Sequence, residues 1–132
     1  MQSAIGKKVN KNSVLFIDDE EVAVDPYINL LNCAGFEVFY ISSGLDCDIF
    51  IENHNISLVI LDLVMPYFDG IEVLKLIRKK WSKEDLPIVM LSSKTSDFDV
   101  EMALVNGANQ FINKLEGTKV VIDCCKKLVS SK

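Results

Sequence analysis

Five short apolar runs alternate along the chain with longer amphipathic segments. The runs VLFI, LVIL and IVML are unbroken, which is typical of strands that are buried on both faces in the middle of a parallel sheet. The run FEVFYI alternates more strongly between apolar and polar positions, which favours a place nearer an edge. The pattern predicts strands over residues 14–17, 37–41, 58–61, 88–91 and 110–112.

The segments between these runs have the period of amphipathic helices. In the first segment Val24, Ile28 and Leu31 fall on one face, and Gly35 follows as a residue that commonly ends a helix. Helices are predicted over residues 22–34, 44–53, 70–81, 97–106 and 118–129. Strict alternation with short connections, under the right-handed crossover rule, predicts the α/β class: a doubly wound, five-stranded parallel sheet with helices on both faces.

Length and charge narrow the classes of function. The 132 residues fit one compact domain, which we expect over residues 12–132, with residues 1–11 as an N-terminal extension. A formal net charge of -5 points away from a nucleic-acid surface, which needs clustered Lys and Arg. No apolar stretch has the length of a signal peptide core or a membrane span, so we expect a cytoplasmic protein that binds neither nucleic acid nor membrane directly.

Polar residues stand just after four of the five apolar runs. Asp18 and Asp19 follow the first run, Asp62 follows the third, Ser92 follows the fourth, and Lys114 comes shortly after the fifth. In open α/β sheets, ligands bind outside the carboxyl ends of the strands. We therefore expect these side chains to share one edge of the sheet.

Each of these residues has a structural interpretation when it is taken alone. Asp18 could favour a helix N-terminus, Asp62 could belong to a turn, Ser92 could cap a helix, and Lys114 could be a solvated cation. Their joint placement favours a site, because crowded carboxylates repel one another and are costly without a compensating cation. Carboxylate oxygens also suit Mg²⁺, which combines one or two carboxylates with phosphate oxygens.

Four longer motifs contain these residues: VLFIDDE, LVILDLVMPYFDG, PIVMLSS and GANQFINK. In this order and spacing they resemble the receiver domain of two-component response regulators, similar to the single-domain chemotaxis regulators, over roughly residues 12–130. The resemblance implies a flavodoxin-like (β/α)5 fold with strand order 2-1-3-4-5. It also implies a phospho-accepting domain that catalyses its own phosphorylation and dephosphorylation, and not a conventional turnover enzyme.

The resemblance assigns a role to each acidic position. Asp62 resembles the phosphoacceptor, and Asp19 resembles the direct ligand of the Mg²⁺ or Mn²⁺ ion beside it. Asp18 resembles the acid that holds the ion through water. The backbone carbonyl of Val64, two residues after the acceptor, resembles the remaining ligand from the protein.

The resemblance also implies contacts to the phosphoryl group and a switch. Lys114 and Ser92 match the residues that contact phosphoryl oxygens. The phosphoryl group would draw Ser92 inward, and the aromatic ring of Phe111 would fill the vacated space. The fourth helix, fifth strand and fifth helix would form the signalling face. The expected partners are a sensor histidine kinase or phosphotransfer protein and a downstream output domain or protein.

Two positions depart from the family pattern. Leu115 follows Lys114 where the family usually has proline, often after a cis peptide bond. A cis bond before a residue other than proline costs about 2.5–4 kcal/mol, so a trans bond is predicted here. Phe111 stands where many members have tyrosine; the ring can still rotate, but the contact of a hydroxyl is lost.

Two other functions fit parts of the pattern. A degenerate receiver would act as a phosphorylation-independent protein-binding module. Against it stands the retention of all five site residues: Asp18, Asp19, Asp62, Ser92 and Lys114. An enzyme that binds a nucleotide or flavin on a similar sheet would need a glycine-rich phosphate loop after the first strand, where aspartates stand instead. The termini fit either a stand-alone regulator or a receiver from a longer chain.

Overall fold

The computed structural model describes residues 12–66 and 68–130. The predicted N-terminal extension, residues 1–11, lies outside the described residues. Strands and helices alternate along the chain as predicted. The elements are β2 (Ser13–Ile17), α1 (Glu21–Cys33), β3 (Glu37–Ile41), α2 (Cys47–His54), β4 (Leu58–Asp62), α3 (Gly70–Arg78), β5 (Ile88–Ser92), α4 (Asp97–Val105), β6 (Gln110–Asn113), η1 (Lys114–Glu116) and α5 (Thr118–Ser130).

One parallel sheet contains all five strands, in the order β3-β2-β4-β5-β6. Counted along the sequence, this is the order 2-1-3-4-5 of the flavodoxin-like fold that the resemblance implied. The central strands β2, β4 and β5 are buried along their whole length, as their unbroken apolar runs predicted. The alternating strand β3 lies at an edge, which confirms its predicted place.

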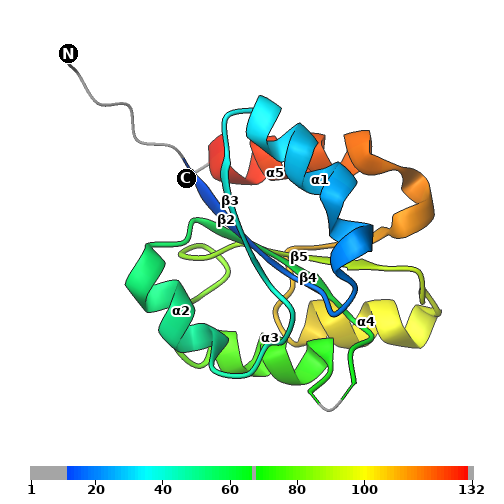
Figure 1. Ribbon diagram of the computed structural model, residues 1–132. Coiled ribbons are helices and arrows are strands. Elements are labelled where there is room, and N and C mark those ends of the chain that lie inside the picture. Colours follow the sequence, from blue (N-terminus) through cyan, green and yellow to red (C-terminus); the bar gives the residue numbers. More distant parts are fainter. Residues whose placement is uncertain (1–11, 67, 131–132) are drawn as a thin grey trace.

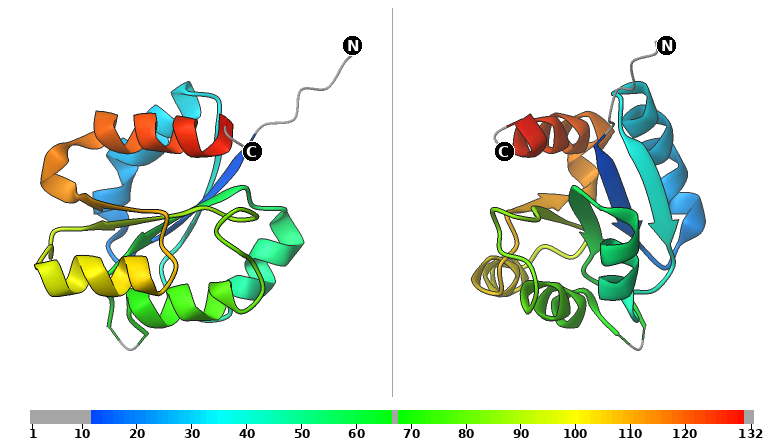
Figure 2. Two further views of the ribbon diagram at one scale, coloured as in Figure 1. Left: turned by 180° about the vertical axis from the view of Figure 1, so that it is seen from behind. Right: turned by 90° about the vertical axis from the view of Figure 1, so that its left-hand side faces the viewer.

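Helices cover both faces of the sheet (Figures 1 and 2). Helices α1 and α5 pack on one face, where their apolar side chains form a cluster with Phe16 of β2. Helices α2, α3 and α4 pack on the other face, around a second cluster that includes Leu15. These adjacent residues of one strand point to opposite layers, so β2 contributes to both halves of the core. None of the described helices is long and apolar enough to cross a membrane.

Three strands, β4, β5 and β6, extend one residue into the polar residues that follow their apolar runs. Asp62 pairs with Leu91 and Ser92 pairs with Asn113 in the sheet register. All three strands therefore end one residue later than predicted. As a result, the side chains of Asp62 and Ser92 project from paired backbone at the carboxyl edge of the sheet, where position is better defined than in a loop.

The helix bounds differ from the prediction where the backbone leaves helical geometry. Helix α2 begins at Cys47 and not at residue 44, because Asp46 adopts a left-handed conformation with φ 59° and ψ 22°, which a right-handed helix cannot contain. Helix α3 ends at Arg78 and not at residue 81. Neither difference moves a predicted site residue.

Candidate functional site

The carboxyl ends of β2 and β4 bring three carboxylates together. Asp18 and Asp19 follow β2, and Asp62 is the last residue of β4, the neighbouring strand. One carboxylate oxygen from each residue lies within 4.8 Å of the other two. Asp18 and Asp62 are buried, whereas Asp19 is exposed. Oxygen ligands in this arrangement fit a hard divalent cation such as Mg²⁺.

Lys114 brings a positive charge to the carboxylates. Its Nζ lies 3.1 Å from Asp18 Oδ2 and 3.8 Å from Asp62 Oδ2. Burial alone would lower the pKa of Lys114, but the negative charges of Asp62 and Asp18 outweigh it and raise the pKa. The ammonium therefore stays protonated and partly compensates the two buried carboxylates.

The start of η1 positions Lys114. The side chain of Asn113 accepts a hydrogen bond from the backbone amide of Leu115 at 2.8 Å, and Glu116 Oε2 accepts from the backbone amide of Asn113 at 3.0 Å. This reciprocal pair is a capping box, which fixes the direction in which the chain leaves β6. All peptide bonds in the described segments are trans, including the Lys114–Leu115 bond, as predicted.

Asp62 has an electrostatic environment unlike that of a surface aspartate. Burial, and to a smaller extent the charge of Asp18, raises the pKa of Asp62 to about 6. Lys114 and a hydrogen bond of 3.3 Å from the backbone amide of Val64 to Asp62 Oδ1 act in the opposite direction. A carboxyl group with a pKa near neutrality, beside a specific charge partner, is typical of functional sites. A bound divalent cation would favour its ionised form.

Gly70 holds the loop that follows Asp62. Its backbone amide donates to the carbonyl of Leu63 at 2.8 Å, and a Cβ at this position would collide with the backbone of Asp62 and Leu63. Asp69, the N-cap of α3, accepts two backbone hydrogen bonds from the first turn of the helix. The Asp-Gly pair therefore packs the start of α3 directly against the strand that carries Asp62.

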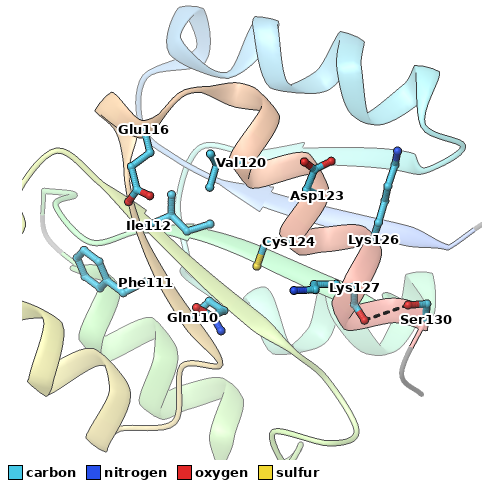
Figure 3. Close-up of a pocket in the computed structure, with 10 residues that line it drawn as sticks. All are labelled: Gln110, Phe111, Ile112, Glu116, Val120, Asp123, Cys124, Lys126, Lys127 and Ser130. Carbon is cyan, nitrogen blue, oxygen red and sulfur yellow. Dashed lines mark hydrogen bonds between the residues drawn. The ribbon is translucent and has the colours of Figure 1, made fainter.

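Ser92 and Phe111 lie on the next two strands. Ser92, the last residue of β5, is buried, and its Oγ accepts a hydrogen bond of 3.0 Å from the backbone amide of Lys94. Phe111 of β6 is half-buried and packs against the core cluster of the α2–α4 layer. In Figure 3 its ring projects from β6 on the side away from α5.

A groove of about 800 Å³ lies between the edge strand β6 and α5 (Figure 3). Phe111, Ile112, Val120 and Cys124 are among the residues that line it. None of the three clustered carboxylates does so. The groove therefore belongs to the predicted signalling face and is separate from the acidic site.

Two tyrosines beside the carboxylates were missed at the level of the sequence. Tyr40 of β3 donates its hydroxyl to the backbone carbonyl of Asp18 at 2.6 Å. Tyr27 of α1 is buried; burial raises its pKa, and the nearby charge of Lys114 opposes that effect. Both residues stand at positions whose pattern indicates ordinary core residues, so no feature of the sequence distinguishes them.

An acidic pocket at the carboxyl edge of a doubly wound, five-stranded sheet is the arrangement of signalling receiver domains. The chain belongs to the response regulator receiver domain family, whose sequence model matches residues 14–124. It is thus a receiver domain of two-component response regulators. Members of this family are phosphorylated on an aspartate, bind Mg²⁺ at an acidic pocket, and interact with histidine kinases and output domains.

Individual relatives agree with this assignment. The chain is 31% identical over 102 residues to sensory transduction protein RegX3 of Mycolicibacterium smegmatis, a match that covers 77% of this chain and 43% of that protein. The chain therefore spans less than half the length of this curated relative.

Two solved structures show the same fold. A response regulator from Thermotoga maritima has a TM-score of 0.80 at 20% identity, covering 92% of this chain and 99% of that one. Chemotaxis protein CheY4 of Vibrio cholerae has a TM-score of 0.81 at 23% identity, covering 90% and 99%.

Proposed function

We propose that this receiver accepts a phosphoryl group on Asp62 from the phosphohistidine of a sensor histidine kinase or phosphotransfer protein. The observation that carries the proposal is the contact of one ammonium, that of Lys114, with both Asp18 and Asp62 at the point where three carboxylates converge. A domain that had become a binding module alone would have no need to maintain these buried charges, which are costly to desolvate.

The proposal assigns Mg²⁺, or Mn²⁺ in its place, to the acidic cluster. Asp18, Asp19 and Asp62 would hold the ion, together with the backbone carbonyl of Val64. Three carboxylates face one ammonium, which leaves negative charge for a cation to neutralise. When bound, the cation supplies positive charge to the acceptor carboxylate and to the phosphoryl oxygens.

The transfer itself depends on positioning and charge. An ionised oxygen of Asp62 forms a bond to phosphorus while the P–N bond of the donor breaks, and the bonding electron pair stays on the imidazole. Negative charge spreads over the three equatorial phosphoryl oxygens, where Lys114 and Ser92 supply N–H and O–H donors. Water can later attack phosphorus, which releases phosphate and restores the Asp62 carboxylate. The domain thus promotes both its phosphorylation and its dephosphorylation.

The proposal connects this site to the face formed by α4, β6 and α5. To contact the phosphoryl group, the Ser92 hydroxyl leaves its hydrogen bond with the amide of Lys94, and the ring of Phe111 turns inward beside it. This movement changes the surface that an output domain or protein recognises. We assign the receiver to residues 12–132 and regard residues 1–11 as an extension of it.

Incubation with acetyl phosphate or phosphoramidate and Mg²⁺, followed by intact-mass measurement, tests the proposal. The wild-type protein should gain one phosphoryl mass, and Asp62→Asn should gain none. Asp123→Asn removes an exposed carboxylate of α5 as a matched control and should gain the same mass as wild type. A folded wild-type protein that binds Mg²⁺ but gains no mass would instead indicate a degenerate receiver.

A further inference from the structure

Every polar group of Asp18 has a hydrogen-bond partner. Its backbone amide donates to the carbonyl of Ile41 at 3.3 Å. Its carboxylate accepts from the backbone amide of Glu20 at 2.9 Å and from Lys114 Nζ at 3.1 Å. Its backbone carbonyl accepts from the hydroxyl of Tyr40 at 2.6 Å, the shortest of the four bonds. Asp18 is therefore fixed by four hydrogen bonds that come from three parts of the chain: β3, Glu20 and Lys114.

The Tyr40 hydroxyl takes the place of a sheet hydrogen bond. Strands β2 and β3 are paired up to Ile17 and Ile41. If the parallel ladder continued, the next bond would run from the backbone amide of Ser43 to the carbonyl of Asp18. The pairing ends at Ile41, and Tyr40 donates to that carbonyl instead. After Asp18, the chain can therefore turn away from the sheet toward α1 while the carbonyl of Asp18 keeps a hydrogen-bond donor.

The carbonyl that Tyr40 contacts belongs to the peptide group that joins Asp18 to Asp19. Because a peptide group is planar, fixing its oxygen also fixes the amide nitrogen of Asp19 and the direction in which the chain continues. The Asp19 carboxylate is exposed and has no hydrogen bond or ion pair to any residue that the structure describes. Its position in the cluster with Asp62 therefore depends on the backbone, and hence on this peptide plane.

Tyr40 is itself well held. It is the penultimate residue of β3, and its half-buried ring packs against the core cluster of the α1–α5 layer. A tyrosine side chain has few torsions to order, so its hydroxyl is a precise donor. Burial, followed by the charges of Asp18, Glu21 and Asp19, raises its pKa, which keeps the hydroxyl protonated.

We infer that Tyr40 is a positioning residue for the divalent cation: its hydroxyl fixes the Asp18–Asp19 peptide so that both carboxylates converge on Asp62. The inference rests on the proposed function and extends it, because it assigns a share of the cation affinity to a residue outside the ligand set. A ligand geometry that is fixed before binding reduces the ordering that the cation must impose.

A titration with Mn²⁺ tests the inference. The electron paramagnetic resonance signal of the free ion measures how much Mn²⁺ the protein has bound. Tyr40→Phe removes the hydroxyl and keeps the ring, and it should weaken Mn²⁺ binding roughly three- to tenfold, as the loss of one net hydrogen bond implies. Tyr27→Phe is the matched control, because the hydroxyl of this tyrosine makes no hydrogen bond within residues 12–66 and 68–130. It should bind Mn²⁺ as the wild type does.

A spectroscopic readout reports on the peptide plane directly. In ¹H–¹⁵N spectra recorded without metal, the amide signal of Asp19 should shift in Tyr40→Phe and not in Tyr27→Phe. If Tyr40→Phe only melts earlier, with unchanged Mn²⁺ affinity and an unchanged Asp19 signal, the tyrosine is structural and the inference is overturned. If the wild type itself binds no more Mn²⁺ than Asp62→Asn does, the proposed function fails first, and the inference fails with it.

Discussion

The ammonium of Lys114 lies 3.1 Å from Asp18 Oδ2, although the two residues are 96 positions apart in the sequence. The distance from the same nitrogen to Asp62 Oδ2 is longer, 3.8 Å. The lysine therefore lies closer to Asp18 than to Asp62, the proposed acceptor. A divalent cation at the carboxylates would take over the compensation of Asp18 and leave Lys114 available for a phosphoryl oxygen.

Lys114→Gln tests this role of the lysine. Phosphorylation by acetyl phosphate should become roughly 100-fold slower, since a donor to the charge that develops in the transition state is lost. The melting temperature should also fall, because Asp18 and Asp62 lose their compensating cation. Lys119→Gln removes an ammonium that pairs with Asp123 on the surface of α5, and it should match wild type in both measurements. An unchanged rate in Lys114→Gln would show that the lysine does not act in the transfer.

The two buried aspartates should affect stability in opposite directions. Asp62→Asn removes a carboxylate whose pKa is raised to about 6, so at pH 8 and without divalent cations it should increase the free energy of unfolding by about 1–3 kcal/mol. Asp18→Asn removes the closest partner of Lys114 and should decrease the free energy of unfolding. Urea unfolding in the presence of a chelator measures both changes. Changes of the same sign would mean that the cost of burying an ionised carboxylate is not concentrated on Asp62.

The pH dependence of stability follows from the pKa of Asp62. The folded pKa of about 6 lies above the usual value for aspartate, about 3.9, so between these values the folded state binds more protons than the unfolded state. The contribution of Asp62 to stability is therefore full below about pH 4 and is lost as the pH rises through about 6. The stability difference between Asp62→Asn and wild type, measured without cations, should grow across this window and level off above it. A difference that does not change with pH would contradict this assignment.

The strands could be predicted because burial on both faces leaves an unbroken apolar run, as in β4. Their order could not, because it depends on pairing between distant segments, such as Val14 with Leu58. It was implied only by the family resemblance. The start of α2 was misplaced because the left-handed conformation of Asp46 depends on how the loop after β3 packs, and a helical pattern does not encode it.

The charged residues of the site could be predicted because each one stands just after an apolar run, and parallel strands end at one edge of the sheet. The partners of those residues could not. Whether Lys114 reaches Asp18 or Asp62 more closely depends on the turn of η1, and the role of Tyr40 depends on where β2 and β3 separate. A tyrosine in an apolar strand fits the core equally well, so only its three-dimensional position reveals the contact with Asp18.

Ser92→Ala tests the connection from the site to the signalling face. In the wild type, Mg²⁺ with beryllofluoride, a phosphoryl analogue, should shift the amide signals of Lys94 and Phe111. The Lys94 amide loses its hydrogen bond to the Ser92 hydroxyl, and the Phe111 ring moves into the space that the hydroxyl vacates. Ser92→Ala should lose the shift at Phe111. Ser93→Ala changes the exposed neighbour and should keep it. A Phe111 shift that persists in Ser92→Ala would show that the ring moves for another reason.

The position of the acyl phosphate in the chain decides whether Asp62 is the phosphoacceptor. The protein is phosphorylated with acetyl phosphate and Mg²⁺, reduced with borohydride, which converts an aspartyl phosphate to homoserine, and then digested for mass spectrometric mapping. We expect homoserine in place of Asp62 and at no other acidic position. Homoserine in place of Asp18 or Asp19, or no homoserine in protein that binds Mg²⁺, would show that Asp62 is not the acceptor.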